Sequence, residues 1–101
     1  MVTLVDETDA NRFVIDVDGV PAGEITYRMR NDRRLILHTG VDTAFEGKGV
    51  GGGAVVALLD GARARGERIV PLCPFVRGYI ERHPDDDDLV DHQLLDELLD
   101  R

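Results

Sequence analysis

The residues best suited to chemistry lie in one short stretch, EGKGVGGG, which runs from Glu46 to Gly53. It contains five of the chain's eleven glycines and its single lysine, Lys48. Glycines let a ligand approach the backbone closely, and unpaired N–H groups at the start of a helix bind anions. Three consecutive glycines would also weaken the first turn of a helix by about 1 kcal/mol each. We therefore predict a site for a phosphate-bearing ligand, with a purely structural turn as the alternative.

The residues before this loop alternate between apolar and polar, which predicts β-strands. Three strands are expected, over Arg12–Val17, Gly23–Met29 and Leu35–Val41, with turns at DGVPAG and NDRR between them. Met1–Val5 is expected to add a short edge strand. These elements predict an antiparallel meander that delivers the chain to the loop.

After the loop the apolar residues recur at helical spacing. They predict a helix over Val50–Arg65 that ends at Gly66. A long strand over Glu67–Cys73 follows, parallel to the last strand of the meander because a helix connects the two. Two further helices are expected over Pro74–Arg82 and Leu89–Leu99, separated by the acidic turn HPDDDD. The fold class is therefore α/β with α+β character: a meander followed by strand, loop, helix, strand and helix.

Composition narrows the function classes. The 101 residues are 43% hydrophobic and 32% charged, which predicts one globular domain over residues 1–101. A formal net charge of −8 disfavours nucleic acid and anionic membranes and favours cationic partners. A single cysteine provides neither a disulfide nor a multi-cysteine metal site, so no metal is expected. Without a signal-like or membrane-spanning segment, a cytoplasmic location is expected.

Three kinds of phosphate loop can be compared with this stretch. A Walker A loop fails, because Gly49 and not Ser or Thr follows Lys48. The dinucleotide fingerprint G-x-G-x-x-G matches by letter, but an antiparallel meander precedes it and no ribose-binding acid follows. The third pattern, [RQ]-x-x-G-x-[GA], aligns with Glu46 to Gly51 and departs from it only at its first position.

This third pattern and the order of elements resemble the GNAT superfamily of acyl-CoA N-acetyltransferases. The run HTGVDTAFEGKGVGG…LLDGARARG…PLCPF…YIERHP…DLV is similar to a minimal branch of about 100 residues and extends the resemblance over nearly the whole chain. The resemblance implies two parallel strands that splay apart, with acetyl-CoA as the acyl donor between them. It also implies a coenzyme site whose residues are Val41, Glu46, Gly47, Lys48, Gly49, Val50, Gly51 and Gly52.

Two departures from the family pattern affect this site. Glu46 stands where the wider motif has Arg or Gln, so the backbone is expected to bind phosphate while Glu46 turns away. Lys48 and Arg82 are the candidates for the missing positive charge. Asp86 replaces a tyrosine that the minimal branch often carries, and the run Asp85–Asp88 is interpreted as a solvated turn that attracts a cationic substrate.

Acyl transfer also needs a polarised carbonyl, a base and a stabilised leaving group. The resemblance implies that the backbone N–H of Val41 polarises the carbonyl. His38 is a candidate base or a polar strand residue, and Glu24 is a second candidate base or a solvent-facing side chain. Cys73 is interpreted as a core residue, a wall of the acyl pocket or a covalent nucleophile, and Tyr79 as a donor to the departing thiolate or a core aromatic.

The leading hypothesis is an acetyl-CoA-dependent N-acetyltransferase that acts on a cationic amine, either a small molecule or a protein side chain. The alternatives are a CoA-binding module without turnover and an interaction protein that uses its acidic face. Either a monomer or a homodimer is compatible with the sequence.

Overall fold

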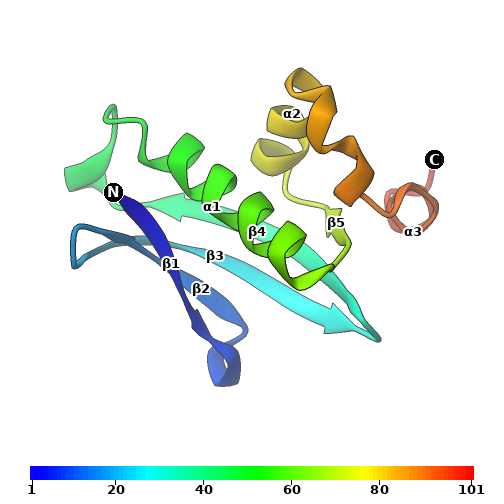
Figure 1. Ribbon diagram of the computed structural model, residues 1–101, viewed down its shortest axis with the longest axis horizontal. Coiled ribbons are helices and arrows are strands. Elements are labelled where there is room, and N and C mark those ends of the chain that lie inside the picture. The colour runs from blue at the N-terminus through cyan, green and yellow to red at the C-terminus, as the bar shows by residue number, and fades with distance from the viewer.

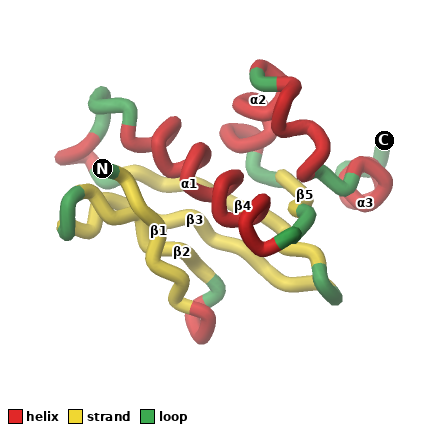
Figure 2. Tube along the Cα trace, viewed as in Figure 1, coloured by secondary structure: helices red, strands yellow, loops and turns green.

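The computed structural model describes residues 1–101, which form one five-stranded sheet in the order β1-β2-β3-β4-β5. The helix α1 crosses one side of this sheet, while α2 and α3 lie toward its β5 edge (Figure 1). The opposite side of β1, β2 and β3 carries no helix, as the Cα trace also shows (Figure 2). The strands are β1 Val2–Glu7, β2 Arg12–Val17, β3 Val20–Arg30, β4 Arg33–Val41 and β5 Ile69–Pro71. The helices are α1 Val50–Arg65, α2 Pro74–Arg82 and α3 His92–Leu98, with 3-10 turns at Thr8–Ala10, Thr43–Phe45 and Pro84–Leu89.

The predicted meander is confirmed, and β2, α1 and α2 have the expected bounds. The expected turn DGVPAG is too long, because β3 begins at Val20 and only Asp18 and Gly19 connect it to β2. Both residues have positive φ, 50° and 90°, as a two-residue hairpin turn requires. Proline at position 21 is tolerated within the strand rather than ending it.

Two expected elements are shorter than predicted. The strand Glu67–Cys73 is reduced to the three residues of β5, because the Glu67 N–H closes the end of α1 by donating to Ala62 O at 2.9 Å and the Leu72 N–H turns back to donate to Val70 O at 3.0 Å. The last helix begins at His92 and not at Leu89, because Asp91 caps it by accepting a hydrogen bond from the Leu94 N–H at 3.0 Å.

The pairing of β3 with β4 contains an irregularity that matters for the site. Tyr27 pairs with Ile36 and Thr26 with His38, which leaves Leu37 without a partner in β3. Such an extra residue is a β-bulge, which bends the strand and changes which side its later side chains face. Parallel pairing of β4 with β5 ends at the same point, at Ile36 and Pro71.

One apolar core joins the sheet to α1 and α2. Alternate residues of the strands, among them Phe13, Ile15 and Ile25, face α1 and are buried. The helix contributes a stripe with the predicted spacing: Val50, Ala54, Val55, Leu58, Leu59 and Ala62. Gly66 ends α1 in the left-handed conformation, at φ 64°.

A buried arginine fastens the strand β4 to the end of α1. The Arg34 guanidinium lies 5.0 Å from the Phe13 ring centroid and 4.4 Å from that of Tyr27. Two hydrogen bonds, at 2.8 and 3.1 Å, join it to the Glu67 carboxylate, which Arg65 also contacts. Burial opposes ionisation of Glu67, but the hydrogen bonds from Arg34 and Arg65 outweigh it and lower its pKa.

The acidic turn is largely paired with cations of its own chain. Arg63 of α1 forms ion pairs with Asp86 and Asp88, and Asp87 lies 2.9 Å from His92. These bonds attach the turn to the helices, so three of its four aspartates already have partners.

No helix in the chain is long and apolar enough to cross a bilayer.

We predict that Glu67→Gln lowers the free energy of unfolding at pH 7 by about 1–2 kcal/mol, because Arg34 keeps a buried charge and only the more distant Asp6, at 3.8 Å, remains as a counter-ion. Because folding lowers the pKa of Glu67 from its ordinary value of 4.5, the stability that this carboxylate contributes is complete above that value. It is lost as the pH falls through the folded-state pKa. The variant should therefore lose less stability than the wild type between about pH 5 and pH 3.

Urea unfolding across that pH range measures the effect, and the exposed, unpaired Glu97→Gln is the matched control. Equal acid sensitivity of wild type and Glu67→Gln would contradict the assignment.

Candidate functional site

The glycine-rich loop takes a conformation that requires glycine at two positions. Gly47 and Gly49 have φ of 77° and 74°, in the left-handed region that other residues rarely adopt. Glu46, between the 3-10 turn Thr43–Phe45 and Gly47, is extended and exposed. These two glycines turn the chain from the end of β4 into α1.

The loop presents a row of unpaired backbone donors. The N–H groups from Gly47 to Gly52 donate to no atom of the protein, and the first bond of α1 is made by Gly53 N–H to Gly49 O at 3.0 Å. No side chain caps this end of the helix. Free N–H groups, together with the positive end of the helix dipole, form a favourable environment for phosphate oxygens.

Few charged side chains accompany these donors. The Lys48 ammonium lies 5.9 Å from the Phe45 ring centroid and makes no ion pair with Glu46 or any other acid. Arg82, the other candidate cation, lies at the far end of α2 from Phe75, the α2 residue that touches the first turn of α1. The arrangement favours Lys48 over Arg82 as the cation of the loop.

The three consecutive glycines in the first turn of α1, Gly51 to Gly53, have different surroundings. A Cβ on Gly51 would lie 3.0 Å from the Phe75 ring, and one on Gly53 would lie 3.0 Å from Val2, so both pack against a neighbouring element. A Cβ on Gly52 would meet nothing within 4 Å. Neither backbone conformation nor packing explains glycine at position 52.

Beyond the bulge, β4 and the segment after β5 separate. Cys73 N–H still donates to Ile36 O at 2.8 Å, but its Sγ then lies 3.6 Å from Thr39 Oγ1, side chain to side chain. Asp42 N–H bonds Ala22 O of β3 at 2.7 Å. Because successive N–H groups of a strand point to opposite edges, that of Val41 points away from β3, toward the gap.

His38 lies on the other side of the sheet. It is exposed, and a Cβ built on Gly40 would be 3.4 Å from its Nε2, so the imidazole extends over Gly40. Thr39 and Val41, with the opposite parity, face α1 and α2. The bulge at Leu37 is the reason, since without it His38 would share the buried side with Ile36.

Cys73 is buried and Tyr79 is half-buried. Cys73 is only 3% exposed and belongs to the core. The Tyr79 ring stacks on His83, with centroids 3.9 Å apart, while the Tyr79 carbonyl contacts His83 Nδ1 at 2.7 Å. The Tyr79 hydroxyl makes no hydrogen bond within the protein.

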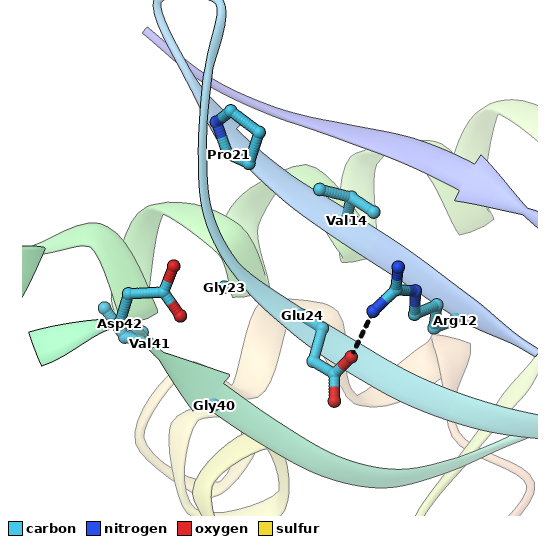
Figure 3. Close-up of a pocket in the computed structure, with 8 residues that line it drawn as sticks. All are labelled: Arg12, Val14, Pro21, Gly23, Glu24, Gly40, Val41 and Asp42. Atoms are coloured by element: carbon cyan, nitrogen blue, oxygen red, sulfur yellow. Dashed lines mark hydrogen bonds and ion pairs between the residues drawn. The ribbon is translucent and has the colours of Figure 1, made fainter.

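A surface hollow at the end of β4 lies on the uncovered side of the sheet (Figure 3). Its lining residues come from β2, β3, the end of β4 and the residue after it: Arg12, Val14, Pro21, Gly23, Glu24, Gly40, Val41 and Asp42. Glu24 is bonded to Arg12 at 2.8 Å there. No surface cavity is lined by the loop 46–49, Cys73 or Tyr79. No three His, Cys, Asp or Glu side chains converge as a metal site requires.

A meander that delivers a glycine-rich loop to a helix, beside a parallel strand that parts from its neighbour, is a GNAT-like fold. The family model for GCN5-related N-acetyl-transferases matches residues 12–89, and the chain belongs to this family. A protein of Staphylococcus aureus with an NMR solution structure, provisionally assigned as a GCN5-like N-acetyltransferase, is 29% identical. The match has a TM-score of 0.62 and covers 89% of this chain and 86% of that one. No curated protein matches the chain.

Sequence reasoning missed three residues that the structure brings to this region. Thr39 contacts Cys73, Asp42 stands at the rim of the hollow, and Arg12 holds Glu24. The signal for Asp42 was available, because it follows the last residue of the predicted strand and precedes the loop. The other two depend on register, which the bulge shifts.

We predict that Gly52→Ala raises the free energy of unfolding by about 1 kcal/mol, because alanine favours the helix and its methyl group meets open space. Gly53→Ala is the control and should gain less, because Val2 must give way. Thermal unfolding of both variants measures the difference. A destabilised Gly52→Ala would show that position 52 has a structural constraint of its own.

Proposed function

We propose that this protein transfers the acetyl group of acetyl-CoA to a cationic amine. The observation that carries the proposal is the run of unpaired N–H groups from Gly47 to Gly52, beside the point where β4 separates from the chain after β5. Membership of the GCN5-related family supports it.

The residues of the loop fit a pyrophosphate. Left-handed glycines at 47 and 49 aim consecutive donors outward, and Gly52 leaves the surface of α1 bare. Lys48 is free to pair with a phosphate, and Glu46 is exposed, with room to turn into solvent. Acetyl-CoA, when bound, supplies the activated thioester. The site assigned to it comprises Val41, Glu46, Gly47, Lys48, Gly49, Val50, Gly51 and Gly52.

The acyl end of the site is assigned to the side of β4 that faces the helices. The Val41 N–H, which points to the gap, is the donor assigned to the thioester carbonyl. Thr39 and Cys73 are assigned to the wall of the acyl pocket, since their side chains touch there. The burial of Cys73 favours a role in the wall of the acyl pocket over a role as a covalent nucleophile, because an attacking thiol must be accessible to the thioester.

Proton transfers are assigned to two side chains. His38, exposed and extended over Gly40, is the proposed base that takes the proton from the amine. Tyr79, whose hydroxyl has no partner in the protein, is the proposed donor to the thiolate that leaves. Glu24 is less suited as the base, because Arg12 holds its carboxylate.

One observation favours a second function. No cavity opens at Cys73, where its contact with Thr39 fills the space between the strands. A protein that binds the nucleotide end of CoA at the loop and does not turn over would need no acyl pocket. Measurement of thiol release in the presence of amines separates the two functions.

We predict that Gly52→Val abolishes binding of acetyl-CoA and leaves the fold intact, because the side chain would fill open space on the ligand side of α1. Isothermal calorimetry measures binding, and circular dichroism monitors the fold. Ala64→Val, exposed near the other end of the same helix, is the matched control. Unchanged affinity in a folded Gly52→Val protein would remove the loop from the site.

We predict that His38→Ala loses at least about tenfold in kcat and keeps its affinity for acetyl-CoA, because the loop lies apart from the imidazole. Its remaining rate should rise with pH as more of the free amine forms in solution. Thiol release at saturating acetyl-CoA from pH 6 to pH 9 is the measurement. A normal rate and pH profile would return His38 to a structural role and leave bound water or Glu24 as the base.

A further inference from the structure

The hollow on the uncovered side of the sheet has a volume of about 350 Å³ and a floor of bare backbone (Figure 3). Gly23 and Gly40 provide this floor from neighbouring strands. A Cβ on Gly23 would lie 2.1 Å from the Gly40 carbonyl oxygen, which no side chain can tolerate. Glycine is therefore obligatory at position 23. Because neither Gly23 nor Gly40 carries a side chain, the surface is depressed there between the side chains around it.

Carboxylates with unused binding capacity stand at its rim. The Asp42 side chain makes no hydrogen bond or ion pair in the protein, and Figure 3 shows its carboxylate directed across the hollow from the end of β4. Glu24 uses only Oε1 to bind Arg12, and Arg12 is shared with Glu7 at 2.6 Å. Arg12, the single cation that lines the hollow, is thus paired with two acids, Glu7 and Glu24. The hollow therefore retains negative charge for a cationic ligand.

The position of the hollow relates it to the acyl site. Val41, whose N–H points to the gap, and Gly40, over which His38 extends, both line it. The loop and the side chains of Thr39 and Val41 lie on the α1 side of β4, while the hollow and His38 lie on the other. The acetyl donor, acetyl-CoA, and the amine that accepts the acetyl group would then reach the end of β4 from opposite sides of the sheet.

We propose that this hollow is the acceptor site, that it takes an aliphatic primary amine carrying a second cationic group, and that Asp42 and Glu24 hold that second group. The inference rests on the proposed acetyltransferase function and names its substrate class. In the reaction, His38 takes a proton from the attacking ammonium. The amine nitrogen then bonds to the acetyl carbonyl carbon, the carbon–sulfur bond breaks, and the proton still carried by the nitrogen compensates the one that Tyr79 gives to the departing thiolate, so that CoA leaves as the thiol. Asp42 and Glu24 are positioning residues, because they contact the end of the acceptor that does not react.

The test compares two ligands of matched length on ¹⁵N-labelled protein. 1,4-Diaminobutane carries the second cation and butylamine lacks it. The diamine should shift the amide resonances of Gly23, Glu24, Gly40 and Asp42 at concentrations where butylamine does not. Added salt should weaken the shifts, because the rim is open to solvent. This binding experiment needs neither acetyl-CoA nor turnover, so it can succeed even if the transferase function fails.

The variant Asp42→Asn removes one charge at constant shape, and Asp60→Asn removes one from an exposed, unpaired position on α1. Asp42→Asn should weaken diamine binding about fivefold, as expected for a partly exposed charge pair. With acetyl-CoA present it should raise the KM for the diamine by the same factor and leave kcat and CoA affinity unchanged. Asp60→Asn should match the wild type in every measurement.

Three results would overturn the proposal. The first is the absence of resonance shifts around the hollow with the diamine, and the second is equal shifts with butylamine. The third is shifts of these amides by a lysine-containing peptide but not by the diamine, which would assign the hollow to a protein acceptor. Resonance shifts together with undetectable thiol release would retain the binding site and reject the proposed function.

Discussion

The geometry of the candidate site depends on one residue of β4 that has no partner in β3. Because Leu37 is an extra residue, the side chains that follow it in β4 face the opposite side of the sheet from the one that regular alternation would give them. Ile36 and His38 therefore face opposite sides. The same irregularity coincides with the end of pairing between β4 and β5. An uninterrupted β4 would bury His38 beneath α1 and would turn the Val41 N–H toward β3, where it could not reach a ligand in the gap.

A second constraint lies at the start of α1, where glycine lowers the stability of the helix but leaves room around its first turn. Glycine at positions 51 and 53 allows Phe75 and Val2 to pack closely, and this packing recovers part of the helix stability that glycine loses. Gly52 recovers nothing from packing. Alanine at that position would make the helix more stable, and the packing of α1 does not explain the glycine.

Much of the fold could be predicted because its determinants are local. The alternation in Arg12–Val17, the apolar stripe and terminal Gly66 of α1, and Pro74 at the start of α2 each define an element without reference to the rest of the chain. The bulge could not be read, because nothing in LILHTG distinguishes a regular strand from one with an extra residue. The shortened β5 depends on backbone hydrogen bonds on either side of it, from Glu67 N–H to Ala62 O and from Leu72 N–H to Val70 O. The loop was predictable from composition, whereas the pairing of Thr39 with Cys73 and the hollow beside Asp42 required the register.

The chain carries one lysine and one thiol, and they differ sharply in access: Lys48 is exposed in the loop, and Cys73 is 3% exposed in the core. Apart from the α-amino group of Met1, an amine-reactive dye would therefore mark a single loop, and a thiol-reactive one would mark only molecules whose interior has opened. Without any engineering, the protein offers two separate spectroscopic handles. One would report on events at the surface of α1, and the other on the frequency with which the segments around Thr39 and Cys73 come apart.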